Sequence, residues 1–354
     1  MVPDQKRTRL TLGGLAQAAG VSKATASMVI NGRPGISEDT RQRVLAIAEE
    51  LGYQPNRAAR EIASGVATTL GIVLSPTQPE HEIPNYYVAE LLAGAEEAAR
   101  ASGYHLRVAA WQPNMVRPPE DSGLAGILYL GGSFDPAVLT RTRLPSVLVG
   151  TFFPQWPFDA VLADNSRGAY LAVSHLIDIG RRRIAFVNGP ARTRTSELKM
   201  LGYRDALAEH GLAIESELIR TGDFSVESGY SAVQDLLTHT RISPDAVFVA
   251  DDPMAFGAVH ALQDRGLSVP DEVSIVGYGD SPTGAVLRPA LSTVRVFQRW
   301  MGSLGARRLI ERLSGQETGS LRILVGPELI VRLSSQPGMG APSSVADSRM
   351  RPNG

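Results

Sequence analysis

Residues 10–51 constrain the fold more than any other stretch of the chain, because they hold three short amphipathic helical patterns joined by tight turns. The first ends at Gly20, and the second runs from Ser22, a good helix cap, to the glycine at 32, which tolerates a left-handed ending. The third begins at Ser37. Its apolar repeat is predicted to consist of Val44, Leu45, Ala48 and Leu51. Three helices this close together predict one compact head with a helix-turn-helix.

The second helix of a helix-turn-helix enters the DNA major groove, so residues 22–28 form the candidate base-reading surface. Residues 1–65 hold nine Lys and Arg against six Asp and Glu, a net charge of +3, whereas the whole chain carries −1. The head is therefore the part of the chain that is expected to bind a polyanion. The excess is modest, and a bundle of this kind can also be a mere packing module. Helix spacing alone leaves both possibilities open.

Several runs of residues resemble the LacI/GalR family of bacterial transcription regulators. The two most specific are AGVSKATASMVING at 19–32 and YQPNRAAR at 53–60. Further runs keep the family's order: DNSRG at 164–168, HL at 175–176, GRRRIA at 180–185 and DDPMAFG at 251–257. The resemblance covers residues 9–333 and implies a dimeric DNA-binding head, a hinge helix that forms on the operator, and a ligand-sensing core similar to periplasmic solute-binding proteins.

The expected fold is an all-α helix-turn-helix head followed by an α/β core of two lobes with doubly wound parallel sheets. A chain of 354 residues is too long for one ordinary core, which agrees with this division. We expect the head at 1–53, the hinge helix and linker at 54–66, the effector-binding and dimerisation core at 67–333, and a disordered tail at 334–354.

Two segments of the core carry particular expectations. Residues 111–123 hold three prolines and no helical period where the family has a crossover helix, so the first lobe is predicted to lack one helix. An irregular loop or a partner would then cover that sheet face. Residues 321–333 are predicted to form a closing pair of strands.

The hinge after Pro55 has room for about seven or eight helical residues, fewer than survive as a helix alone in water. The hinge helix should fold only when it packs against the hinge helix of the second protomer and against the minor groove. Ile62 occupies the family's wedge position, where an apolar side chain can enter a base step and kink the duplex. The alternative is that Ile62 packs on its own domain. The predicted DNA-binding residues are Thr11, Leu12, Ser22, Lys23, Ala24, Thr25, Ser27, Met28, Asn31, Asn56, Arg57 and Ile62.

Two doubly wound lobes bind ligands at the carboxyl ends of their strands. The resemblance implies these effector-binding residues: Ser75, Tyr86, Tyr87, Lys199, Phe224, Asp251 and Asp280. Sugar-sensing members carry a carboxylate, an arginine, an asparagine and an aspartate at four positions that here read Gly150, Lys199, Asp251 and Gly279.

These replacements make a standard monosaccharide effector less expected, because two carboxylates and the planar fork of arginine are lost. Asp251 adds a negative charge that can pair with Lys199 or with a ligand amine. In the alternative, Asp280 substitutes for the missing aspartate.

The expected function is sequence-specific transcriptional regulation, with repression as the mode, by a homodimer on a pseudopalindromic operator. A second possibility is a regulator of the same fold that has lost small-molecule sensing and responds to a protein partner. A solute-binding transport component would need an export signal and would not carry a basic helix-turn-helix.

An enzyme is disfavoured, because the chain has no dinucleotide or phosphate-loop motif and its six histidines show no metal spacing. The absence of cysteine excludes thiol catalysis and disulfides. We expect no catalytic residue, no cofactor, no metal and no membrane segment, and a cytoplasmic location.

Overall fold

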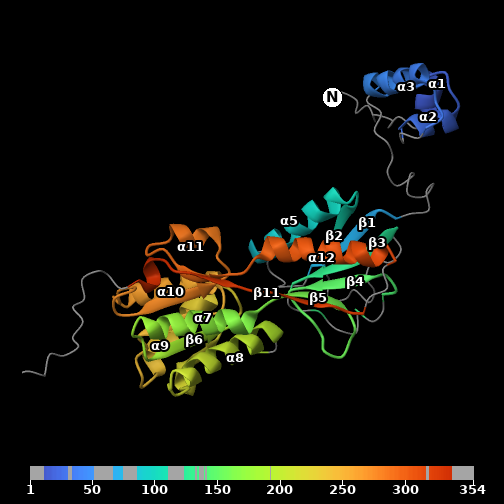
Figure 1. Ribbon diagram of the computed structural model, residues 1–354. Helices are drawn as coiled ribbons and strands as arrows, with labels where there is room; N and C mark the ends of the chain where they lie inside the picture. The colour runs from blue at the N-terminus through green and yellow to red at the C-terminus, as the bar shows by residue number, and fades with distance from the viewer. Residues whose placement is uncertain are drawn as a thin grey trace, which may run out of the picture. The chain divides into compact units, whose positions relative to one another are not determined.

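The computed structural model covers residues 1–354 and describes 12–30, 34–51, 67–74, 86–110, 123–131, 134, 139, 142–191, 193–315 and 319–336. The chain divides into two compact units, residues 1–68 and 69–354 (Figure 1). The described part of the first unit is helical, and the second unit contains two six-stranded sheets with helices packed on them. The predicted fold class is confirmed.

The head contains α1 (Leu12–Ala18), α2 (Lys23–Ile30) and α3 (Glu38–Glu50). Its core is small and aliphatic, formed by Leu15, Ala19, Val29, Val44 and Ala48. The hydroxyl of Ser22 accepts a hydrogen bond from the Thr25 N–H at 3.0 Å, which caps α2 as predicted.

The third helix differs from its predicted pattern. Val44 and Ala48 are buried, but Leu45 and Leu51 are 46% and 45% exposed. The helix faces its neighbours along Val44, Ile47 and Ala48, so a residue next to Val44 in sequence points about 100° away from that line. The prediction that Leu45 and Leu51 belong to the buried face is wrong.

Lobe 1 is built on an all-parallel sheet with the order β11-β5-β4-β3-β1-β2. Helices α5 (Tyr86–Ala101) and α12 (Gln298–Leu313) pack against each other, and both contact this sheet. The strands are β1 (Thr69–Leu74), β2 (His105–Ala110), β3 (Leu124–Leu130), β4 (Ser146–Val149), β5 (Asp159–Ala163) and β11 (Arg322–Val325).

A second apolar cluster in lobe 1 includes Val73, Ile127, Tyr129 and Leu148, which alternate along their strands with residues of the main core. Packed against it are Phe134 and Leu139 and, from the loop between β4 and β5, Phe152, Phe153 and Phe158. This irregular aromatic loop therefore helps to cover the second sheet face. Residues 111–122, where the absent helix is predicted, lie outside the described residues.

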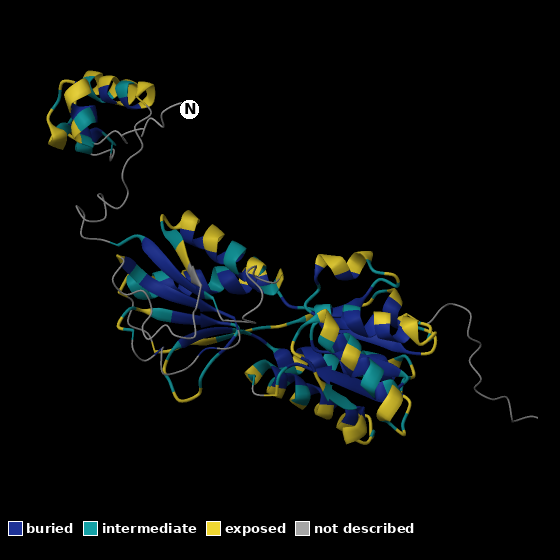
Figure 2. Ribbon diagram, turned by 180° about the vertical axis from the view of Figure 1, so that it is seen from behind, coloured by how far each residue is buried: buried dark blue, intermediate teal, exposed yellow. Residues whose placement is uncertain are grey.

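Lobe 2 has a sheet with the order β12-β10-β9-β8-β6-β7, parallel except where β12 pairs antiparallel to β10. Its strands are β6 (Ile184–Asn188), β7 (Ile219–Thr221), β8 (Ala246–Val249), β9 (Ser274–Tyr278), β10 (Ser292–Arg295) and β12 (Glu328–Ile330). The strands β6, β8 and β9 are buried along their whole length and are dark blue in Figure 2.

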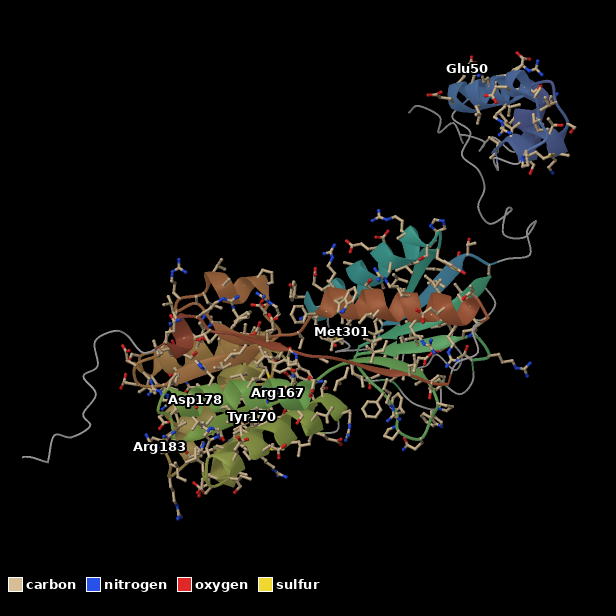
Figure 3. All side chains as sticks on the ribbon, in the orientation of Figure 1. Glu50, Arg167, Tyr170, Asp178, Arg183 and Met301 are labelled. Atoms are coloured by element: carbon tan, nitrogen blue, oxygen red, sulfur yellow. The ribbon has the colours of Figure 1, made fainter. Side chains whose placement is uncertain are left out.

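The helices of lobe 2 pack mainly in pairs. Helix α7 (Asn165–Asp178) lies on α8 (Arg194–Glu209), and α9 (Val226–His239) lies on α10 (Asp252–Asp264). On α7, Tyr170 donates a hydrogen bond to Glu209 of α8 at 2.7 Å, and the guanidinium of Arg167 lies 5.0 Å from the Tyr170 ring centroid (Figure 3). The short helix α11 (Pro282–Val286) follows β9.

The chain passes between the lobes three times, from β5 to α7, from β10 to α12 and from β11 to β12. The last passage corrects a prediction. β11 and β12 do not pair with each other, because β11 pairs with β5 in lobe 1 and β12 with β10 in lobe 2.

The start of the expected disordered tail is also folded. Ser334 and Ser335 belong to the 3-10 helix η3 (Leu333–Ser335) and are fully buried in lobe 2. The Ser334 hydroxyl donates to the Ile275 carbonyl at 2.7 Å, and the Ser335 hydroxyl donates to Ser292 at 2.7 Å. Residues 337–354 lie outside the described residues.

Candidate DNA-binding and effector sites

Helix α2 presents a polar surface and an apolar surface. Ala26 and Val29 are buried, whereas Lys23 and Ala24 are exposed at the start of the helix. Ser22, also exposed, bonds to the Thr25 hydroxyl at 2.8 Å, and this pair therefore shapes the entry to the helix. Of the predicted base-reading stretch, Ser22, Lys23 and Ala24 thus lie exposed on the head, whereas Ala26 faces its core.

The other predicted DNA contacts divide into two groups. Ser27 and Met28 are partly exposed, and Leu12 packs against the head core, which leaves only part of its side chain for DNA. The remaining predicted contacts lie outside the described residues: Thr11, Asn31, Asn56, Arg57 and Ile62.

In lobe 2, Lys199 of α8 is buried and turned into the protein. Its Nζ donates to the Ala250 carbonyl at 2.6 Å and lies 3.8 Å from the centroid of the Tyr278 ring. Burial lowers the pKa of Lys199 to about 8, although the carboxylates of Asp251 and Asp252 oppose this shift. The ammonium group therefore already contacts a carbonyl oxygen and the face of an aromatic ring within the protein.

Asp251 lies at the carboxyl end of β8, immediately before α10. Its side chain does not cap that helix, and its Oδ1 is a buried atom with no hydrogen-bond partner among the described residues. Burial raises the pKa of Asp251 well above its ordinary value, while the charge of Lys199 opposes the rise. No ion pair within 4.0 Å joins the described side chains of Asp251 and Lys199, so the predicted pairing acts only over a longer range.

Tyr278 connects this region to α7, because its hydroxyl donates to Asn165 Oδ1 at 3.0 Å. Burial, with the nearby Tyr87 of lobe 1, raises the pKa of Tyr278, and burial raises the pKa of Tyr87 to about 12. A Cβ on Gly150 would lie 2.8 Å from the Tyr87 hydroxyl. Tyr87 therefore fills the place of the family's carboxylate. Sequence reasoning missed Asn165 and Tyr278, although Asn165 follows the end of β5 and Tyr278 is the last residue of β9.

Phe224 also lies near the carboxyl edge of the lobe 2 sheet. A Cβ on Gly189 would come within 2.3 Å of its ring, so the ring lies directly over that glycine at the end of β6. Phe224 has φ 72, a left-handed conformation that is uncommon outside glycine. The structure thus places four predicted effector residues at or near this edge: Lys199, Asp251, Phe224 and, from lobe 1, Tyr87.

Asp280 and Tyr86 line a different pocket, of about 510 Å³, which also includes Glu90, Arg295 and Trp300. Asp280 accepts hydrogen bonds from Arg295 at 2.7 Å and from Arg332 at 2.6 Å, so both of its oxygens are paired. Its neighbour Asp252 is also satisfied, by Thr293 and the Ser281 N–H at 2.7 Å each. The expectation that Asp280 replaces the missing effector-binding aspartate lacks support here. Ser75 lies outside the described residues.

Comparisons with known proteins place both parts of the chain in known families. The model of bacterial regulatory proteins of the lacI family matches residues 11–56, and the model of the periplasmic binding protein-like domain matches residues 173–335. The catabolite control protein A of Priestia megaterium is 33% identical over 91% of this chain and 97% of its own length. The chain belongs to the LacI family.

Solved structures of family members share the whole architecture. A complex of the transcriptional regulator CelR with cellobiose aligns with a TM-score of 0.68 and 30% identity over 92% of this chain and 99% of CelR. The lac repressor dimer bound to operator and the anti-inducer ONPF aligns with a TM-score of 0.79 and 25% identity over 93% and 99% of the two chains.

Membership in the LacI family decides the class of function. The protein is a DNA-binding transcriptional regulator with an effector-binding core, and LacI-family regulators are not enzymes. Operator DNA and small-molecule effectors are the family's typical partners. Within the described residues, no group of three acidic or histidine side chains is placed to hold a metal ion. No helix in that part of the chain is long and apolar enough to cross a membrane.

Proposed function

We propose that this protein represses transcription by binding a pseudopalindromic operator as a homodimer. The observation that carries the proposal is α2, whose Ala26 and Val29 anchor it in the head while Lys23 and Ala24 face outward beside partly exposed Ser27. Such a helix fits the major groove. One head offers little surface, and a dimer reads two half-sites related by the protein's own symmetry. A regulator acting on bacterial operators works in the cytoplasm.

The test combines binding-site selection from randomised DNA with a footprint of the purified protein. Symmetric protection of two half-sites is expected. Lys23→Ala should weaken operator binding, whereas Arg204→Ala, which removes an equally exposed cation from α8 of the core, should leave it unchanged. Protection of one asymmetric half-site by a monomer would contradict the proposal.

The proposed effector site lies at the carboxyl edge of the lobe 2 sheet, next to Lys199, Phe224 and Asp251, with Tyr87 from lobe 1. The four contacts that sugar-sensing members use are all altered. Tyr87 fills the place of one carboxylate at Gly150, Gly279 lacks the other, and Lys199 turns inward. The adjacent Asp280 is paired with two arginines. These features support an effector other than a standard monosaccharide.

A thermal-shift screen across sugars, nucleosides, polyols and amino compounds tests for such a site. A ligand at 100 times its Kd should stabilise the protein by about 2.7 kcal/mol. A regulator that senses a protein partner instead would bind its operator normally and show no stabilisation by any small molecule.

A further inference from the structure

The proposed effector site contains more acidic than basic side chains. Lys199 supplies one ammonium group, and the two carboxylates that act on its charge are those of Asp251 and Asp252. Lys199 donates to the Ala250 carbonyl and lies over the Tyr278 ring, so its hydrogen-bonding capacity is partly used within the protein. A ligand that enters this region therefore meets two carboxyl groups and one ammonium group.

The two carboxyl groups differ in whether their oxygens accept hydrogen bonds. Asp252 accepts hydrogen bonds at both oxygens, from Thr293 at 2.7 Å and from the Ser281 N–H at 2.7 Å. Asp251 Oδ1 is buried and has no hydrogen-bond partner among the described residues, and its side chain caps no helix. A buried carboxyl oxygen without a donor is unfavourable, which makes Asp251 the group that gains most from a bound donor.

The surroundings of Asp251 suit a cation. Asp251 lies at the carboxyl edge of the sheet beside the end of β9, where Tyr278 already accommodates the Lys199 ammonium on its ring. Arginine, the usual cationic donor of the family at position 199, is absent. An aspartate in place of an asparagine also removes the NH₂ donor that a neutral hydroxyl oxygen would use.

We propose that the effector of this regulator carries a protonated amine, which donates to Asp251 and stabilises the ionised form of its side chain. This inference rests on the proposed effector-binding function. It separates this protein's ligand from neutral sugars, whose hydroxyl groups need both donors and acceptors. Neutral compounds should bind less well than amines of the same skeleton.

The test uses sets of compounds that share one skeleton and differ at one position. One set is glucosamine, glucose and N-acetylglucosamine, and another is 1,4-diaminobutane and 1,4-butanediol, extended to amino sugars and amino alcohols of other shapes. Thermal shift of the full-length protein is measured at pH 7, together with the effect of each compound on operator binding. At least one amine should raise the Tm while its neutral counterpart does not.

Asp251→Asn is the decisive variant, because it removes the charge and keeps the side-chain volume. Binding of the stabilising amine should weaken about 10- to 100-fold, the loss typical of a hydrogen bond to a charged group. Asp205→Asn, an exposed aspartate of α8, should bind the amine as the wild type does. Urea unfolding and operator binding without ligand establish that both variants are folded.

Stabilisation by neutral compounds only, or by no amine of the panel, overturns the proposal. So does an Asp251→Asn variant that is folded and binds the amine unchanged. Failure of the proposed regulator function gives a different result, since the ligand-free wild type would then select no operator from randomised DNA.

Discussion

Asp159 shows how one side chain joins three elements of lobe 1. It lies at the start of β5 and is 2% exposed. Its Oδ2 accepts from Arg308 at 3.0 Å and from Arg312 at 2.7 Å, both on α12, while Oδ1 accepts from the Leu321 N–H that precedes β11. Burial acts to raise the pKa of Asp159, but these hydrogen bonds outweigh it and hold the pKa below its ordinary value.

Asp159→Asn should destabilise the core by about 3–5 kcal/mol, because it removes the buried charge partner of Arg308 and leaves only the half-exposed Glu311. Urea unfolding followed by circular dichroism measures the change. Glu311→Gln, which alters the half-exposed second partner of Arg308, should cost less than about 1 kcal/mol. Equal effects of the two substitutions would show that the Asp159 pair contributes no more than a surface ion pair.

The pH dependence follows from the lowered pKa of Asp159. Its stabilising contribution is fully present above the ordinary carboxyl pKa of 3.8 and is lost as the pH falls through the lower folded-state pKa. The stability difference between wild type and Asp159→Asn should therefore be constant from pH 7 to about pH 5 and shrink at strongly acidic pH. A difference that grows on acidification would have the wrong sign.

Met28 of α2 is partly exposed, and its side chain cannot read a base as an arginine does. A thioether offers apolar contact, for instance with a thymine methyl, whereas arginine reads guanine bidentately for about 1–3 kcal/mol of discrimination. Met28→Arg should create a guanine preference at one base pair per half-site and leave the others little changed. Binding-site selection measures this, and an unchanged base profile would mean that Met28 faces the head core.

Among the elements, α5 and α12 form the closest helix pair in lobe 1. They meet at glycines, since a Cβ on Gly94 would lie 1.8 Å from the Arg299 carbonyl oxygen and a Cβ on Gly302 1.9 Å from that of Leu91. Met301, beside the second contact, is fully buried (Figure 3). The backbones can approach this closely only because neither helix carries a side chain at the crossing.

Gly302→Ala should therefore destabilise the core by about 1–3 kcal/mol or more, because a backbone carbonyl cannot move aside as a flexible side chain can. Thermal and urea unfolding measure the loss. Gly326→Ala, in the turn between β11 and β12, adds a methyl group where no atom lies within 4 Å and should change stability by less than about 0.5 kcal/mol. A neutral Gly302→Ala would indicate that the helices separate at little cost.

For the molecule as a whole, operator binding is predicted to depend on the linker between head and core. Ile62 lies outside the described residues, and its role as an apolar wedge remains a prediction. Ile62→Gly should sharply weaken specific binding and leave non-specific, salt-sensitive binding nearly intact, since it removes an apolar insertion and no charge. Titrations on operator and random DNA at several salt concentrations test this. Equal losses on both would favour packing of Ile62 on its own domain.

Features with a local physical cause were predictable from the sequence. The caps at Ser22 and Ser37 and the glycine turn at Gly20 depend on residues within one helical turn, and the structure has all three. The family resemblance added the order of the two lobes, which periodicity alone does not contain.

Features that depend on distant partners were decided by the tertiary structure. β5 has only five residues, and no local pattern distinguished it from the preceding loop. β11 and β12 are close in sequence but join different sheets, because each completes an edge left open by strands far away. Lys199 turns inward because Ala250 and Tyr278 lie there, and Asp280 already accepts hydrogen bonds from Arg295 and Arg332. The sequence alone therefore determined the family and the helices, whereas the side chains left for the effector depend on contacts between distant segments. Lys199 and Tyr278, for example, are 79 residues apart.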